Sequence, residues 1–200
     1  MGDWFDAAVE HTFGREGGFT GKDGLPHDSG GPTNMGVTLA TLRAVLRVDA
    51  DGDGWADGDF DRDGDIGWRD VQLLPRSVAK ERIYRPRYWD APRLGLIARK
   101  RVAIKVFDLG VHAGPRAAIA VLQRAVNEAR TVGVYPLRID GRLGTFTAAA
   151  IVRCDEELLL SAMVAEQATF YLAIIEQDPT QEGFRKNWLR RAAWIGGQAA

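Results

Sequence analysis

The chain has 200 residues, of which 46% are hydrophobic and 26% charged, a composition typical of a soluble globular protein with one substantial core or two small ones. Its net charge of -1 excludes the broad basic field that binds nucleic acid or an anionic membrane surface. No apolar stretch approaches the roughly 20 residues of a membrane span, and the N-terminus lacks the apolar block of a secretory signal. The single cysteine, Cys154, permits no internal disulfide, so we expect a small buried residue there.

The first third of the chain predicts two helices separated by a glycine-rich loop. Apolar residues recur at helical spacing over residues 3–14, and Asp3 can cap that helix. Residues 15–37 are dense in Gly, Pro, Asp and Asn, so we expect a loop or a small hairpin near residue 20. A second helix is predicted over residues 38–47, with Thr38 as its cap.

The later segments predict a mainly α-helical protein. The stretch "WRDVQLLPRSVAKERIYRPRYWD" predicts a helix that breaks at Pro75 and resumes over residues 77–84. The stretch "RKRVAIKVFDLGVHAG" favours a helix over a buried strand, and Pro115 suits the first turn of the next helix. After a turn-rich link come three further helical segments, residues 145–154, 155–177 and 182–196.

The run "DADGDGWADGDFDRDGDIGWRD", residues 49–70, predicts a metal site. Counted from its eleventh residue, acidic side chains fall at positions 1, 3, 5, 7 and 12 of an EF-hand or dockerin-type loop, with Gly64 at position 6. The acidic residues in this frame are Asp59, Asp61, Asp63, Asp65 and Asp70. A solvated acidic loop is the alternative, but so many like charges repel one another unless a cation neutralises them. We therefore expect bound calcium, which many flexible oxygen ligands favour over magnesium.

A second, overlapping frame begins at the first residue of the same run. It places Asp49, Asp51, Asp53 and Asp57 at ligand positions but Phe60 at position 12. The two frames cannot both be complete, independent loops, so we predict one calcium ion, or two if the first loop borrows a carboxylate from its neighbour. The ion is expected to be structural and to tie the helix over residues 38–47 to the helix after residue 70.

Glu16 closes the first predicted helix, next to aromatic residues and a Gly-Gly turn. A carboxyl group in that place is disfavoured in its charged form, so Glu16 could stay protonated and act as a general acid. Asp28, Thr33 and Asn34 follow in a loop that could face it, and a pair of carboxyl groups is the usual equipment for glycoside hydrolysis. From composition alone, a Glu before Gly-Gly is more often a surface helix end.

Several ordered blocks resemble the glycoside hydrolase family 108 muramidases. "EGGF" and "DSGGPTNMGVTLATL" resemble the N-terminal motif of that family, and "ERIYRPRYWD" and "VFDLGVHAG" resemble two later blocks. "LQRAV", "IDGRLGTFT" and "FRKNWLRR" resemble its C-terminal peptidoglycan-binding type 3 region. The resemblance covers nearly the whole chain except roughly residues 48–69, so the acidic run is interpreted as an insertion.

The resemblance implies a lysozyme-like helical fold and N-acetylmuramidase activity on the β-1,4 bond after N-acetylmuramic acid in peptidoglycan. Glu16 matches the catalytic Glu of the family. By analogy with phage-type lysozymes, Asp28 and Thr33 are further catalytic candidates that would position water or stabilise charge. Their structural alternatives are an Asx-turn and a hydroxyl bonded to backbone.

Four residues are candidates for substrate binding: Asn34, Tyr88, Asp108 and His112. A buried Asp108 needs a partner, which a nearby Arg or a hydrogen bond in the cleft could provide. For Tyr84 and Trp89 we favour core packing over sugar stacking. His27 is expected to be exposed, and Lys100, Arg101 and Lys105 are expected to form a solvated basic face.

The sequence therefore predicts a catalytic region over residues 1–106 with a calcium loop at 49–70, and a peptidoglycan-binding type region over residues 107–200, packed as one unit. We expect a monomeric peptidoglycan hydrolase that binds no nucleic acid and does not insert into a membrane. It would be made in the cytoplasm and released through a holin, as a phage or prophage endolysin is. The alternatives are a non-catalytic, calcium-dependent peptidoglycan-binding module and a dockerin-like interaction module.

Overall fold

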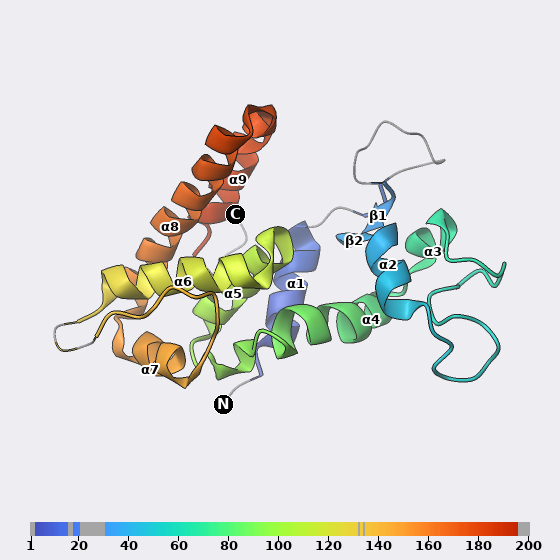
Figure 1. Ribbon diagram of the computed structural model, residues 1–200, viewed down its shortest axis with the longest axis horizontal. Helices are drawn as coiled ribbons and strands as arrows, with labels where there is room; N and C mark the ends of the chain where they lie inside the picture. The colour runs from blue at the N-terminus through green and yellow to red at the C-terminus, as the bar shows by residue number, and fades with distance from the viewer. Residues whose placement is uncertain (1–2, 16–17, 21–30, 132, 134, 196–200) are drawn as a thin grey trace. The chain divides into compact units, whose positions relative to one another are not determined.

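The structure is a computed structural model that describes residues 3–15, 18–20, 31–131, 133 and 135–195 (Figure 1). This part of the chain is mostly helical and contains a two-stranded antiparallel hairpin, which confirms the predicted fold class. Contacts divide the chain into two compact units. We call them the hairpin unit, Val9–Arg87, and the helical unit, Met1–Ala8 with Tyr88–Ala200. The predicted division at residue 107 stays a prediction.

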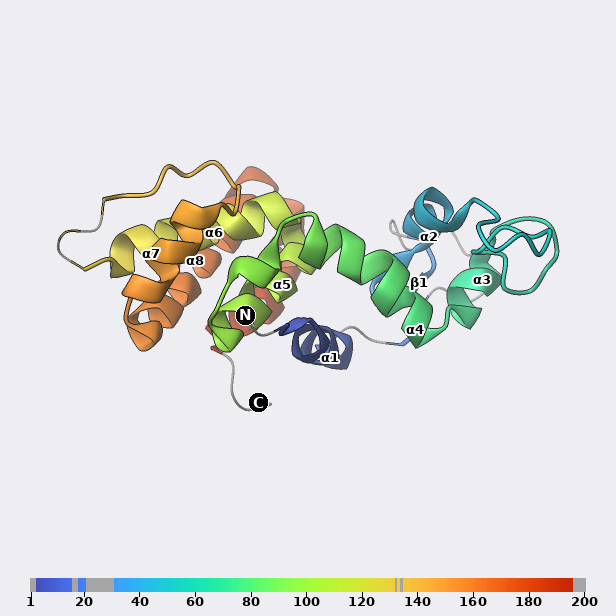
Figure 2. The ribbon, with the colours of Figure 1, turned by 90° about the horizontal axis from the view of Figure 1, so that it is seen from below.

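The hairpin unit holds the short elements that surround the acidic run. The strands β1 (Thr33–Asn34) and β2 (Val37–Thr38) pair and lead directly into α2 (Leu39–Leu46). The hydroxyl of Thr38 accepts a hydrogen bond from the backbone N–H of Thr41, which confirms the predicted cap. Two successive loops then connect α2 to α3 (Trp68–Leu73), as Figure 2 shows from below.

Beyond α3 the helix breaks at the predicted proline and then continues further than predicted. A short α4 (Arg76–Val78) follows Pro75 and passes into η2 (Ala79–Asp90), a π-helical segment that contains Pro86. The predicted end at residue 84 is therefore wrong. A proline ring clashes with the carbonyl four residues earlier in an α-helix, and the wider π-turn changes that spacing.

The helical unit is built on α5 (Lys100–Ala113), α6 (Pro115–Ala129) and α8 (Glu156–Gln177). The helix α6 packs against both α5 and α8, and α8 packs against α9 (Arg185–Ala193). The predicted helix before residue 114 and the predicted proline in the first turn of α6 are confirmed. The smaller elements of this unit are η3 (Leu94–Leu96), α7 (Thr145–Arg153) and η4 (Pro179–Phe184).

Aromatic rings fill one part of the helical unit's core. Phe5, near the start of α1 (Phe5–Arg15), lies with its ring centroid 5.7 Å from that of Trp89 and 6.0 Å from that of Phe107. Trp89 is 3% exposed, so its predicted role in packing is confirmed. Asp3 accepts a hydrogen bond from the backbone N–H of Phe5 and so caps α1 as predicted.

The link between α6 and α7 is held by two amide side chains one helical turn apart. Gln123 is buried and hydrogen-bonds through both its oxygen and its nitrogen to backbone and side-chain groups of residues 140–142. Asn127 exchanges two hydrogen bonds with the backbone of Leu137. Gly141 has a φ of +68°, and an added Cβ would lie 2.5 Å from the Cγ of Arg116, so only glycine fits there.

The helix α8 is more apolar than the sequence analysis allowed. It has 22 residues and contains an 18-residue window with a mean hydropathy of 1.7, enough by length and composition to cross a membrane. It also buries a stripe of side chains at helical spacing against its neighbours, and 33% of its apolar window is buried. Cys154, just before it, is 3% exposed as predicted, and burial raises the pKa of its thiol.

The predicted solvated basic face on α5 is wrong for one of its members. Lys105 is 2% exposed, and its Nζ donates to the carbonyl oxygens of Ala192 and Trp194, each at 2.7 Å. These carbonyls end α9, where a helix leaves acceptors without intrahelical donors and carries partial negative charge. The buried ammonium group therefore caps α9.

Replacing Lys105 with Met should lower the free energy of unfolding by about 3 kcal/mol, because it removes two charge-assisted hydrogen bonds and leaves carbonyl groups without a donor. Urea unfolding monitored by circular dichroism measures this. The matched control is Lys100→Met, on the same helix but exposed, which should change stability by less than about 0.5 kcal/mol. Equal stability of the two variants would contradict the capping role.

Candidate functional site

The proposed general acid and one of its partners lie outside the described residues. These are Glu16 and Asp28, and the same holds for His27. The structure does describe the segments on either side of them along the chain. The helix α1 ends at Arg15, the residue before Glu16, and β1 begins at Thr33.

The last turns of α1 are anchored by contacts inside the hairpin unit. Phe13 is 7% exposed and meets Tyr84 edge to face, with ring centroids 5.0 Å apart. Arg76 lies over the ring of Phe13, with its guanidinium carbon 4.9 Å from the ring centroid. Its guanidinium also pairs with Glu10 at 2.6 Å. These contacts fix the helix end that precedes Glu16.

Tyr84 also fixes the hairpin. It is 1% exposed, and its hydroxyl donates to the carbonyl oxygen of Met35 at 2.5 Å. Met35 and Gly36 form the two-residue turn, and both have positive φ, +51° and +72°, as the type I′ turn of a tight hairpin requires. The core packing predicted for Tyr84 is confirmed, but its hydrogen bond to the turn was not foreseen.

Thr33 and Asn34 are both engaged by the protein. The backbone of Thr33 exchanges two hydrogen bonds with Thr20, and the hydroxyls of these two residues lie 2.6 Å apart. The amide nitrogen of Asn34 donates to the carbonyls of Val71 and Gln72 at 2.9 and 3.2 Å, at the end of α3. Both side chains therefore brace the hairpin, and their predicted roles toward the substrate stay predictions.

The helical unit contains the other three substrate candidates. Tyr88 is half-buried on η2. Asp108 is 3% exposed, and both of its oxygens accept hydrogen bonds from the guanidinium of Arg191, at 2.8 and 2.9 Å. Of the two kinds of partner expected for Asp108, the arginine is present, and it lies on α9, too far along the chain for any local motif to reveal. Such a bidentate pair links α5 to α9.

His112 ends a chain of hydrogen bonds beside that pair. The amide of Gln167 donates to the hydroxyl of Tyr171 at 3.1 Å, and this hydroxyl lies 3.2 Å from Nδ1 of His112. The imidazole ring also meets the rings of Tyr171 and Trp188 edge to face. Burial and then the nearby charge of Arg191 lower the pKa of His112 to about 4. The Nδ1 of a neutral His112 can accept a hydrogen bond from the hydroxyl of Tyr171, which an imidazolium cannot do.

The second acidic loop has the backbone turn of a cation-binding loop. Oxygen atoms of Asp59, Asp61 and Asp63 lie within 4.8 Å of one another. Asp59 accepts hydrogen bonds from the N–H groups of Asp63 and Gly64, and the latter residue turns the chain with a φ of +95°. Oδ1 of Asp61 is buried without a hydrogen-bond partner among the described residues, and burial and repulsion from neighbouring carboxylates raise the pKa of Asp61.

The remaining two predicted ligands of this loop face other partners. Asp70 is 1% exposed, and its carboxylate accepts the N–H groups of Phe60, Asp61 and Gly67, so it joins the start of the loop to its end. The side chain of Asp65 turns away and pairs with Arg43 at 3.0 Å. Position 7 of such a loop offers its backbone carbonyl, so this side-chain contact is compatible with a cation.

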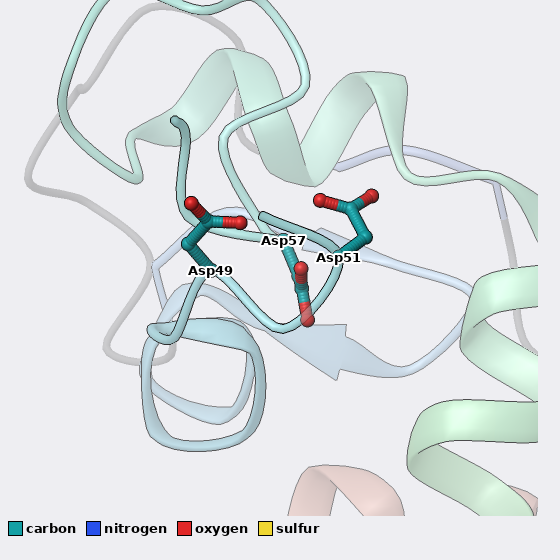
Figure 3. Close-up of side chains that lie close together, drawn as sticks. All are labelled: Asp49, Asp51 and Asp57. Carbon is teal, nitrogen blue, oxygen red and sulfur yellow. The ribbon is translucent and has the colours of Figure 1, made fainter. Parts of the chain in front are cut away.

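The first loop repeats the backbone pattern of the second, and Figure 3 shows three of its carboxylates, those of Asp49, Asp51 and Asp57. Asp49 accepts hydrogen bonds from the N–H groups of Asp53 and Gly54, which are the equivalent positions, and Gly54 has a φ of +93°. Oxygen atoms of Asp49, Asp51 and Asp57 lie within 4.8 Å of one another. The repeat extends further than the overlapping frames suggested, because the incomplete first frame still forms the turn.

Arginine side chains, which sequence reasoning missed, neutralise part of the first loop. Arg82 on η2 pairs with Asp57, and Arg62 pairs with Asp53 at 2.9 Å. The N–H of Ala50, followed by Arg82, keeps the pKa of Asp57 below its usual range. Because Asp53 and Asp57 each hold a guanidinium, the second loop is left as the stronger candidate for a metal ion.

The first loop also closes on itself. The N–H groups of Asp57 and Gly58 donate to the carbonyls of Val48 and Leu46, so the chain returns to the end of α2. A Cβ at Gly58 would lie 3.0 Å from Cβ of Leu46 and from Cδ1 of Ile66. Ile66 is 6% exposed and packs inward.

The lowered pKa of His112 predicts a specific dependence of stability on pH. Between about pH 6.5 and 4 the unfolded chain binds more protons than the folded chain, so the free energy of unfolding should fall as the pH drops through this window. Since part of the side chain is exposed, we expect a loss of about 1 kcal/mol rather than the full linkage value. Urea unfolding at pH 7 and 4.5 measures it, and His112→Asn should lack this component. The same pH dependence in both proteins would contradict the prediction.

Comparisons with known proteins divide the chain between residues 114 and 117, inside the helical unit. The family described as "Glycosyl hydrolase 108" matches residues 9–114, and the family described as "Predicted Peptidoglycan domain" matches residues 117–193. A solved structure, that of SagA from Brucella abortus, is 28% identical, with a TM-score of 0.63, and the match covers 94% of this chain and 89% of that one. No curated protein matches the chain. Because the first family matches more than half of it, the chain belongs to glycosyl hydrolase family 108 and carries a peptidoglycan domain.

Proposed function

We propose that this peptidoglycan hydrolase is an N-acetylmuramidase that cleaves the β-1,4 bond between N-acetylmuramic acid and N-acetylglucosamine. The observation that carries the proposal is the order of the two matched families, a glycosyl hydrolase followed by a peptidoglycan domain in one chain. The braced hairpin and the anchored end of α1 support it, because they flank Glu16 and Asp28 along the chain.

In this mechanism Glu16 protonates the glycosidic oxygen while a water molecule attacks the sugar carbon from the other face. Asp28 and Thr33 are proposed to orient that water or to stabilise the developing positive charge. The contact of the Thr33 hydroxyl with Thr20 supports a fixed orientation of this side chain. We further propose that the protein acts as a monomer on bacterial cell walls, in the manner of a phage or prophage endolysin.

We also propose that the loop over residues 59–70 holds one calcium ion, with the loop over residues 49–60 as a second site. The donor set supports this, because every candidate ligand is an oxygen and Oδ1 of Asp61 is buried without a donor among the described residues. An ion there would stabilise the loops that connect α2 to α3 and would supply no group to the hydrolysis.

Replacing Glu16 with Gln should abolish the clearing of purified cell walls, with a rate loss of at least about 100-fold, because the amide cannot donate the proton. Turbidity loss of a peptidoglycan suspension and mass spectrometry of the released fragments measure the rate and the bond that is cut.

The matched control for this experiment is Glu10→Gln, on the same helix. Glu10 pairs with Arg76 at the surface, so this variant should keep nearly full activity. Equal wall clearing by wild type and Glu16→Gln would favour a non-catalytic binding module, and fragments cut at another bond would exclude muramidase action.

Removing calcium with a chelator should lower the melting temperature by roughly 5–10 °C, by linkage at an ion concentration about 100 times the dissociation constant. Asp61→Asn should reduce the stabilisation by added calcium, yet should not destabilise the chelated protein, because it removes one of several repelling charges.

The control for the metal site is Asp65→Asn, whose side chain faces Arg43. This variant should respond to calcium as the wild type does. A wild-type melting temperature that is the same with chelator and with millimolar calcium would refute the calcium proposal without affecting the enzyme proposal.

A further inference from the structure

A pocket of about 640 Å³ lies within the hairpin unit, between α2 and the two acidic loops. Residues 54–56 of the first loop and residues 64–66 of the second line it, and these are the same positions of the repeated turn. Arg43 and Arg47, four residues apart on one face of α2, line it as well. The volume is in the range of sites that hold a small organic ligand.

The two arginines of the pocket differ in their partners. Arg43 donates to the carbonyl oxygen of Ile66 at 2.6 Å and to Asp65 at 3.0 Å. Arg47 has no hydrogen bond or ion pair with any residue that the structure describes. The repeat explains the difference, because the first loop carries Trp55 where the second carries Asp65. The pocket therefore presents one guanidinium that can bind an anion.

Trp55 supplies the other half of a recognition surface. Trp55 lines the pocket and is 37% exposed, so part of its indole ring is open to a ligand. The apolar side chains of Ala44, Ala56 and Ile66 line the same pocket. An exposed aromatic ring offers a flat apolar surface on which the face of a pyranose ring can stack, next to the guanidinium of Arg47.

We propose that this pocket is a second peptidoglycan-binding site, which takes a disaccharide–peptide unit with its sugar on Trp55 and a stem-peptide carboxylate on Arg47. The inference rests on the proposed function, because that supplies the polymer. The pair of Arg43 and Asp65 at the same pocket adds charges of both signs, which suits a peptide bearing carboxylates and an amine. A free phosphate or acetate would satisfy Arg47 but not Trp55.

The test uses the full chain with Glu16→Gln, so that the ligand is not cut, in calcium-containing buffer. Isothermal titration with a soluble disaccharide–tetrapeptide should show a binding event at the pocket, in addition to binding by the catalytic region and by the peptidoglycan domain. Trp55→Ala and Arg47→Gln should each abolish one event or weaken it at least about 10-fold. The control Arg69→Gln removes an exposed arginine on α3 outside the pocket and should leave every binding event in place.

Three ligand arms distinguish the sources of the anion. The peptide-free disaccharide should bind the pocket more weakly than the disaccharide–tetrapeptide does, and this difference should vanish in Arg47→Gln. Binding of inorganic phosphate or acetate as tight as that of the disaccharide–tetrapeptide would overturn the assignment. Identical binding by Trp55→Ala, Arg47→Gln and Arg69→Gln would overturn it too, whereas wall clearing by the wild type tests the enzyme separately. If Trp55→Ala lowers the melting temperature, the binding measurement on Arg47→Gln decides the test, because that residue is exposed.

Discussion

The hydrogen bond from Tyr84 to the carbonyl oxygen of Met35 is the constraint on which the hairpin unit depends. It is made by a buried side chain that also packs edge to face on Phe13, so one residue of η2 touches both the end of α1 and the hairpin turn. The turn needs positive φ at a non-glycine residue, a conformation that costs free energy and that surrounding contacts must maintain. Without Tyr84, the segments on either side of Glu16 and Asp28 would lose their common support.

The acidic insertion follows a different logic, in which like charges are distributed over two copies of one turn. Each copy begins with an Asp that gathers N–H groups from the following residues, at Asp49 and at Asp59. The copies differ in how the charge is balanced. Arginines pair with Asp53 and Asp57 in the first, whereas Asp61 in the second keeps an oxygen without a donor among the described residues. The same divergence puts Trp55 in one copy and Asp65 in the other, and so creates a pocket with an unlike pair of walls.

Local patterns were sufficient to predict most helices, since caps and prolines act on their own neighbours. Thr38, Pro75 and Pro115 mark boundaries as predicted. The failures come from interactions that local patterns do not encode. The sequence predicted Lys105 as part of a basic surface, but its ammonium group donates to two carbonyl groups at the end of α9. The apolar surroundings of Asp108 on its helix predicted that it needs a partner. They could not identify Arg191, because that residue is on a distant segment.

For the candidate site, the sequence predicted which residue types take part better than it predicted which residues they contact. The acidic residues of the insertion were recognised from their spacing, but the arginines that hold three of them were not, since guanidinium partners obey no fixed spacing. The amide nitrogen of Asn34 donates to carbonyls at the end of α3, contacts that no local pattern indicated, and its predicted role toward the substrate stays a prediction. The resemblance to a hydrolase family pointed to Glu16, and neither composition nor periodicity alone would have selected it over the other glutamates of the chain.

The self-closing geometry of the first acidic loop has an evolutionary consequence. Because the chain leaves α2 and returns to the same carbonyls, with Gly58 held against Leu46, the excursion begins and ends at one point. A segment of this kind can be gained by duplication or lost by deletion while the helices on either side keep their spacing. Homologues could then carry different numbers of this turn without any change to the hydrolase that carries it.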